Sequence, residues 1–122
     1  MPQSCRQFWP GLMGRNVLNF NWDAIDHDSV VLISASEFHN DGFTADHHRY
    51  VGAATITVCN ISPHGPPFDP NGNHGVQFAI QIDWESPLNI VTDITVLDKP
   101  VDVEPPAYGY GPGAYPDGYA AG

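Results

Sequence analysis

Apolar and polar residues alternate along most of the chain from about Arg15 to Asp98. A period of two is the pattern of β-strands that bury one face. The alternation is most regular over residues 76–84, whose apolar positions are Val76, Phe78, Ile80, Ile82 and Trp84. We expect this face to point into the core, and we expect Trp84→Ala to destabilise the protein by about 3–5 kcal/mol, as for a buried aromatic residue.

Four further segments have the composition of strands. Arg15–Trp22 alternates cleanly, and Val30–Phe38 is apolar on both faces at its centre, which predicts a central strand. Arg49–Ile61 is long and rich in β-branched residues, with a bulge or close packing expected at the small residues 52–54. Ile90–Val96 supplies the last strand.

The strand count predicts the fold class. No segment shows the sustained 3.6-residue period of a long helix, so the domain over residues 15–98 is expected to be all-β. An antiparallel β-sandwich of immunoglobulin-like size is the first choice, and a small β-barrel is the alternative. Residues 1–14 are interpreted as an aromatic arm that packs or caps rather than as a regular element, although this arm and residues 101–103 could add edge strands.

Residues 99–122 differ in composition from the rest of the chain. They form a low-complexity tail rich in Pro, Gly and Tyr, which has too little aliphatic surface to fold alone. Tyrosine offers a large amphipathic contact area and loses little rotamer entropy on binding. We therefore predict that the tail binds a partner through Tyr108, Tyr110, Tyr115 and Tyr119.

The net charge argues against nucleic acid and anionic membranes as binding partners. The 122 residues include four Lys and Arg against fourteen Asp and Glu, which gives a formal charge of −10. Binding to nucleic acid or to an anionic membrane surface draws on clustered basic residues, so neither is expected. Residues 1–14 lack the pattern of a secretory signal, and no apolar run approaches a membrane span. The cytoplasm, or release and assembly without a classical signal, is therefore the expected location.

Histidine and carboxylate residues gather in the predicted loops. If the strands alternate in direction, one end of the sandwich collects Asp23, Asp26, His27, Asp28, His64, Asp69 and His74. The other end collects Glu37, His39, Asp41, Asp46, His47, His48 and Glu85. These residue types are ligands for Zn²⁺, and carboxylates are ligands for Ca²⁺. A divalent metal site is hypothesised at the first end from His27, His64, His74 and Asp69, against the simpler interpretation that these loops are polar because they meet water.

Aromatic residues near loops suggest a binding surface. Trp9 and Phe68 are the candidates, because binding sites often place an aromatic side chain beside polar hydrogen-bonding groups. The alternative for Phe68 is that it packs under its own loop as a small satellite core. The long loop over Ser62–Gly75 carries Phe68, and long loops without structure of their own are often functional. Cys5 and Cys59 are interpreted as two free thiols, since a single distant pair is no disulfide framework.

Three hypotheses of function follow. No nucleophile elbow, zinc-protease motif or phosphate-binding glycine loop is present, which favours a non-catalytic protein over an enzyme. The first hypothesis is a structural subunit whose arm and tail clasp copies of itself or a larger assembly. The second is a lectin-like module that binds a carbohydrate, with or without calcium, through Ser62–Gly75 and residues 23–28. The third is a small metalloenzyme that uses His27, His64 and His74.

Overall fold

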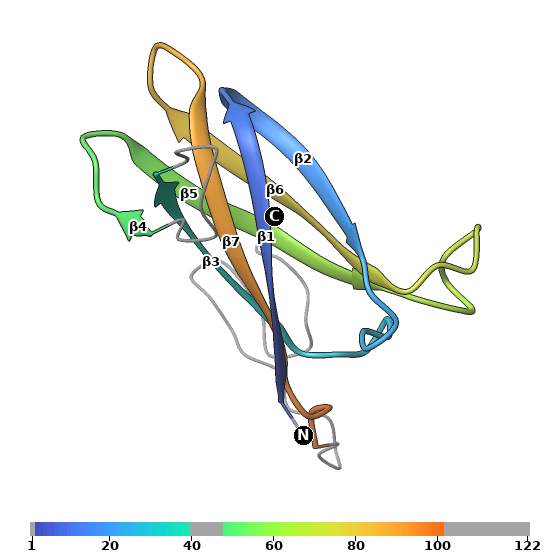
Figure 1. Cartoon of the computed structure of the whole chain (residues 1–122). Coiled ribbons are helices and arrows are strands. Elements are labelled where there is room, and N and C mark those ends of the chain that lie inside the picture. The colour runs from blue at the N-terminus through green and yellow to red at the C-terminus, as the bar shows by residue number, and fades with distance from the viewer. Residues whose placement is uncertain (1, 40–47, 102–122) are drawn as a thin grey trace, which may run out of the picture.

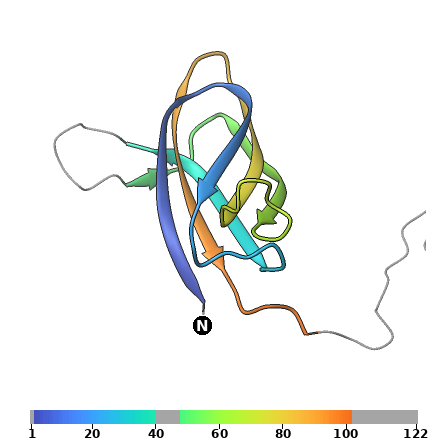
Figure 2. The ribbon, with the colours of Figure 1, turned by 90° about the vertical axis from the view of Figure 1, so that its right-hand side faces the viewer.

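The computed structural model describes residues 2–39 and 48–101, and all regular secondary structure in this part of the chain is β-strand. The strands form two antiparallel sheets, one of four strands and one of three, which pack face to face (Figures 1 and 2). The predicted all-β antiparallel class is therefore confirmed. The described residues contain no helix long and apolar enough to cross a membrane.

The four-stranded sheet has the order β1-β7-β3-β4. Its strands are β1 (Gln3–Leu12), β7 (Leu88–Val96), β3 (Val31–Phe38) and β4 (Arg49–Tyr50). β7 lies at the centre and pairs antiparallel with β1 on one side and β3 on the other. The predicted strand at 30–38 is thus confirmed, and its inner neighbour β7 is the better buried of the two.

The three-stranded sheet has the order β2-β6-β5. Its strands are β2 (Gly14–Asn21), β6 (Gly75–Asp83) and β5 (Thr55–His64). β6 is the central strand, and its alternating residues Val76, Phe78, Ile80 and Ile82 are at most 1% exposed. They pack against the inward residues of β7, so the two central strands supply most of the core.

Trp84 does not continue this buried row. β6 ends at Asp83, and the Trp84 side chain is 41% exposed in the turn that leads to β7. The inward placement predicted for Trp84 is wrong because the alternation outlasts the strand by one residue. The cost of 3–5 kcal/mol expected for its loss therefore does not apply.

The N-terminal residues form a strand rather than an irregular arm. Residues 3–12 pair with β7 along its whole length, from Gln3 opposite Val96 to Leu12 opposite Leu88. Phe8 packs edge-to-face on Phe38 at 4.9 Å between ring centroids, while the next residue, Trp9, faces the core. Two consecutive aromatic residues on opposite faces give no simple alternation, which explains why the pattern did not predict a strand.

The predicted strand over 49–61 is two strands in two sheets. Residues 51–54 carry the chain from β4 in one sheet to β5 in the other. Close packing at Gly52 is confirmed, because a Cβ atom there would lie 2.1 Å from Oε2 of Glu37. β5 then extends to His64, so the loop is shorter than predicted; Pro63 is tolerated because β5 is an edge strand.

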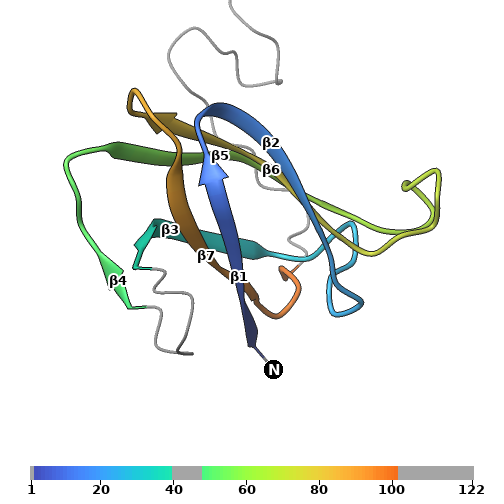
Figure 3. The same ribbon diagram turned by 45° about the horizontal axis from the view of Figure 1, so that its top comes forward.

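The loops gather at two ends of the sandwich, as the alternation of strand direction predicted. The β2–β3 loop, the β5–β6 loop and residues 97–101 lie at one end (Figure 1). In Figure 2 the two loops face the viewer. The turns β1–β2 and β6–β7 and the crossing segment 51–54 lie at the other end (Figure 3). Of the residues 101–103, only Val101 is described, and it lies outside any strand.

Candidate functional site

A polar cavity of about 430 Å³ lies where the outer face of the three-stranded sheet meets the β5–β6 loop. Amide side chains from both sheet and loop surround it, together with one imidazole, one carboxylate and one exposed aromatic ring. The lining residues are Asn19, Asn21, His64, Phe68, Asp69, Pro70, Asn71, Asn73 and Gln77.

The strands set the floor of this cavity. β2 alternates strictly, so Asn19 and Asn21 point outward while Leu18 and Phe20 point to the core. Asn19 lies opposite Gln77 of β6 in the register. Asn21 lies opposite Gly75, where a Cβ atom would approach the carbonyl oxygen of Phe20 to 2.3 Å. Glycine at this position therefore lets the strands lie close beside Asn21.

His64, at the end of β5, links the floor to the loop. Its Nε2 lies 2.7 Å from Oδ1 of Asn19. Its Nδ1 lies 3.0 Å from the carbonyl oxygen of Asn73 and 2.8 Å from Oδ2 of Asp69. Asn19 in turn donates from Nδ2 to Oδ1 of Asn21 at 2.8 Å. One imidazole therefore fixes the positions of a floor amide and two loop residues.

The loop is braced by its own hydrogen bonds. The backbone N–H groups of Phe68 and Asp69 donate to the carbonyl oxygen of Gly65 at 3.0 and 3.1 Å. Oδ1 of Asp69 accepts the backbone N–H of Asn71 at 2.7 Å, and Gly72 closes the turn at a φ of 71°. Such internal bonding holds the loop in one conformation without a ligand.

Phe68 is held in an exposed position at the rim. Its side chain is 72% exposed, and its ring contacts the His27 ring edge-to-face at 4.7 Å between centroids. Phe68 is therefore accessible rather than tucked under its own loop, and its role in binding stays a prediction. Trp9 differs, because it packs against both core clusters, and its expected exposure beside a loop is wrong.

Several amides of the cavity keep hydrogen-bonding capacity for a ligand. Within the described residues, no hydrogen bond is formed by the side-chain amides of Asn71, Asn73 and Gln77. Each carries one acceptor oxygen and an NH₂ donor group. The cavity therefore presents paired donors and acceptors beside an exposed ring.

A second cluster lies next to this site and ties the chain after β7 to the β2–β3 loop. Nζ of Lys99 lies 3.0 Å from Oδ2 of Asp26 and 3.0 Å from Oδ1 of Asp28. The hydrogen bond from Lys99 is the main cause that lowers the pKa of each carboxyl, and the two carboxylates raise the pKa of Lys99. His74 joins through Nδ1, 3.1 Å from Oδ1 of Asp26.

The residues predicted as metal ligands are divided between these clusters. His64 and Asp69 contact each other, His74 contacts Asp26 and the carbonyl oxygen of Ile25, and His27 contacts Phe68. Over residues 2–39 and 48–101, no group of three or more His, Cys, Asp or Glu side chains is arranged to hold a metal ion.

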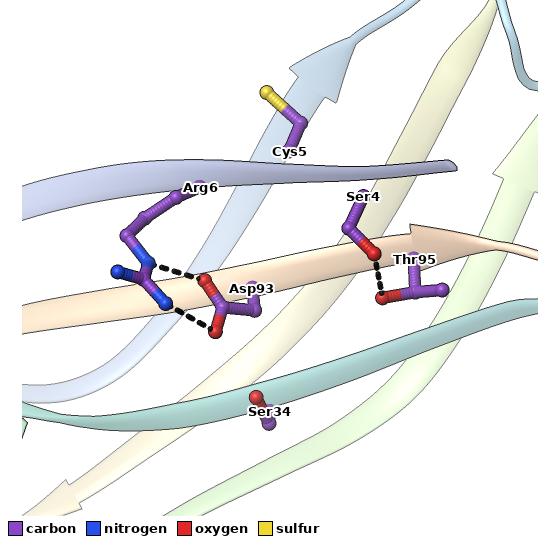
Figure 4. A pocket seen from close by; sticks show the side chains of 6 residues that line it. All are labelled: Ser4, Cys5, Arg6, Ser34, Asp93 and Thr95. Atoms are coloured by element: carbon purple, nitrogen blue, oxygen red, sulfur yellow. Dashed lines mark hydrogen bonds and ion pairs between the residues drawn. The ribbon is translucent and has the colours of Figure 1, made fainter. Parts of the chain in front are cut away.

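The outer face of the four-stranded sheet carries another polar surface (Figure 4). Arg6 donates to both oxygens of Asp93, at 2.7 and 3.0 Å, and Arg49 pairs with the same carboxylate. The hydroxyl oxygens of Ser4 and Thr95 lie 2.8 Å apart. The hydrogen bond from Arg6 is the main cause that lowers the pKa of Asp93. These groups satisfy one another, which indicates a role in joining β1, β7 and β4.

The structure leaves the tail residues Tyr108, Tyr110, Tyr115 and Tyr119 outside the described part of the chain. Cys5 on β1 and Cys59 on β5 are free thiols, as predicted. The sequence analysis did not predict the amides Asn19, Asn21 and Gln77 as site residues, because an uncharged amide on a strand carries no metal-ligand or catalytic motif. Asparagine at two successive outward positions of a strand was the available signal, since strands are depleted in Asn.

Compared with protein-family models, curated protein sequences and solved structures, the chain matches none.

Proposed function

We propose that this protein is a carbohydrate-binding module, and that the cavity between β2 and the β5–β6 loop holds a neutral sugar. The observation that carries the proposal is the exposed Phe68 ring beside amides that have no other hydrogen-bond partner in the described chain. A pyranose ring has an apolar C–H face and a rim of hydroxyl groups. Such a ligand would lie on the aromatic ring and share its hydroxyls with the amides.

Charge and order support a neutral ligand. The formal charge of −10 repels acidic sugars, and the Asp69 carboxylate of the site already contacts Nδ1 of His64. The network through His64 holds the site in place before binding, so little conformational entropy is lost when a ligand enters.

The same contacts favour binding without a metal ion. Both oxygens of Asp69 accept hydrogen bonds or an ion-pair contact from the protein, and both ring nitrogens of His64 face protein oxygens. A metal ion could bind these atoms only by displacing bonds that hold the loop. We therefore propose that calcium is not required.

A glycan array followed by calorimetry with the best ligand tests the proposal. Phe68→Ala and Gln77→Ala should each weaken binding about tenfold or more, as for an aromatic anchor and a buried hydrogen bond. Trp84→Ala is the matched control, because it removes an exposed aromatic side chain from the opposite end. A chelator should leave binding unchanged. If no glycan on the array binds, or if Trp84→Ala and Phe68→Ala weaken binding equally, the proposal is contradicted.

Assembly with copies of itself is the second candidate function, favoured by the edge of β2. This strand is eight residues long, contains no proline or register shift, and pairs only with β6 among the described strands. An uninterrupted edge of this kind can accept another strand. The exposed residue Val17, at 54%, lies on the outer face beside it.

Native mass spectrometry of the full chain distinguishes the assembly candidate. The full chain is expected to form oligomers. If β2 forms the contact, Val17→Lys should reduce the observed mass to that of the monomer. If the tail forms the contact, deletion of residues 105–122 should do so. A monomer at all concentrations would remove this candidate and leave the carbohydrate proposal standing.

A further inference from the structure

A second cavity, of about 170 Å³, lies at the end of the sandwich opposite the proposed carbohydrate site. It opens between the last residues of β3, the short strand β4 and the segment that crosses to β5. Its walls include Ala35, Glu37, Tyr50, Val51, Gly52 and Ile56. Ser36 also lines the cavity, so three of its residues are polar, the others are apolar, and Glu37 is its one acidic group.

Glu37 is the unusual residue of this pocket. It is only 6% exposed, on the inward face of β3 beside Ile90. Tyr50 donates from its hydroxyl to Oε1 of Glu37 at 3.2 Å. Burial raises the pKa of Tyr50, and the Glu37 charge raises it further, so the phenol stays protonated and remains a donor.

The second oxygen of Glu37 has no such partner. Oε2 lies 2.1 Å from the position that a Cβ atom on Gly52 would take, so this oxygen packs against the glycine and a larger residue at position 52 would collide with it. Within the described residues, no hydrogen bond or ion pair reaches Oε2. The basic residue nearest in sequence, Arg49, is engaged by Ser36 and Asp93 on the outer face of the sheet.

A buried carboxylate with one neutral donor is a costly arrangement in a folded protein. Removing such a group from water is unfavourable unless a cation or further hydrogen bonds compensate. A bound cation that donated to Oε2 would supply this compensation. The pocket is therefore complementary to a positive charge carried on an apolar stem.

We propose that this pocket binds an alkylammonium group, with the ammonium on Glu37 and the alkyl stem along Val51 and Ile56. An ammonium fits better than a guanidinium, because a planar guanidinium is best matched by two open carboxylate oxygens and here Oε1 already accepts from Tyr50. The group could belong to a lysine side chain of a bound peptide or to a free alkylamine.

The test is an NMR titration of the ¹⁵N-labelled full chain with n-butylammonium, using n-butanol as the uncharged ligand of the same length. Saturable shifts of the amides of Tyr50, Gly52 and Ala54 are expected with the ammonium and not with the alcohol. Glu37→Gln should weaken binding at least tenfold, because it removes the charge but keeps an acceptor for Tyr50. Glu85→Gln, at an exposed acidic residue of the same end, should not.

Two further ligands identify the source of the ammonium. Binding of Nα-acetyl-lysine-methylamide, abolished by acetylation of its side chain, would assign the pocket to lysine peptides. If n-butylammonium binds and the lysine derivative does not, the pocket would be assigned to free amines. Equal shifts with n-butanol, or unchanged binding in Glu37→Gln, would overturn the proposal. The glycan experiment above is independent, since it concerns the other end of the molecule.

Discussion

Trp9 tests whether the first strand is an integral part of the fold. Its indole N–H donates to Oγ1 of Thr92 at 2.8 Å, and Thr92 is fully buried. The indole ring also meets Phe78 edge-to-face at 6.2 Å and packs against both core clusters. One side chain of β1 is thus fixed by a hydrogen bond to β7 and by apolar contact with β6.

The contacts set the expected magnitudes. Trp9→Ala should lower the free energy of unfolding by about 3 kcal/mol, the lower end of the range for aromatic truncation, because Trp9 is partly exposed. Trp84→Ala is the control, and at 41% exposure it should cost about 1 kcal/mol or less. An N-terminal arm that only covers the surface would show no such difference.

A double-mutant cycle isolates the hydrogen bond. Trp9→Phe keeps an aromatic ring and removes the N–H donor, while Thr92→Val removes the acceptor. The coupling between the two should be about 1 kcal/mol, the usual net value of one hydrogen bond. Thr92 also donates to the carbonyl oxygen of Gln7 at 3.3 Å. Thr92→Val removes this hydrogen bond in both the wild-type and the Trp9→Phe background, so its loss cancels in the coupling energy.

Urea denaturation followed by far-UV circular dichroism is the assay, since tryptophan fluorescence would change with the variants themselves. An unchanged denaturant slope would show that the variants alter stability rather than the extent of unfolding. If Trp9→Ala costs no more than Trp84→Ala and the coupling is near zero, the packing described for β1 is incorrect.

Two further outcomes are expected in the same assay. Ile80→Ala, which empties a fully buried position, should lower the free energy of unfolding by about 2–5 kcal/mol. Val17→Ala, at a side chain that is 54% exposed, should lower it by less than about 0.5 kcal/mol. Similar costs for the two variants would argue against the assigned faces of the three-stranded sheet. Because Lys99 lowers the pKa of Asp26 and Asp28 from 3.8, its contribution is complete above pH 3.8 and lost as the pH falls through the lowered values. The reduction of the urea midpoint by Lys99→Met should therefore be largest at pH 6 and should shrink as the pH is lowered below 3.8, and a reduction that does not change with pH would contradict the ion-pair assignment.

Strands with one buried face were predictable from the sequence. β2 alternates between half-buried and exposed residues over its full length, and β6 does so apart from the buried Gly75 and Ala79, so the period of two identifies both strands. Phe8 and Trp9 break this rule, because both faces of β1 find an aromatic or apolar partner. The division at Gly52 depends on contact with Glu37, which lies far away in sequence and leaves no local signal beyond a small residue.

The candidate site was predictable in part. Alternation of strand direction placed Phe68 and His64 at the same end as the β2–β3 loop, and the structure confirms it. The partners of His64 were not predictable, because its bonds to Asn19 and Asp69 require the exact register of β5 on β6 and the loop conformation. Periodicity gives the face of a residue, but hydrogen-bond partners need three-dimensional register.

The positions of β6 and β7 have a consequence for the order of folding. β6 is the central strand of one sheet, β7 is the central strand of the other, and they are consecutive in the chain. β2 and β5 pair only with β6 among the described strands, while β1 and β3 both pair with β7. β6 and β7 therefore carry most of the strand pairing of the two sheets, although they lie in different sheets and do not pair with each other.

The pairing of β1 must wait for β7. β1 reaches its partner only when Val96 is available opposite Gln3, and contacts so distant in sequence form slowly because a large loop must close first. During synthesis, the backbone of β1 remains without its strand partner until β7 is made, whereas the ring partners of Phe8 and Trp9, which are Phe38 and Phe78, are made earlier. The four-stranded sheet is therefore completed only when this last strand joins β1 to β3, which has β4 as its other partner.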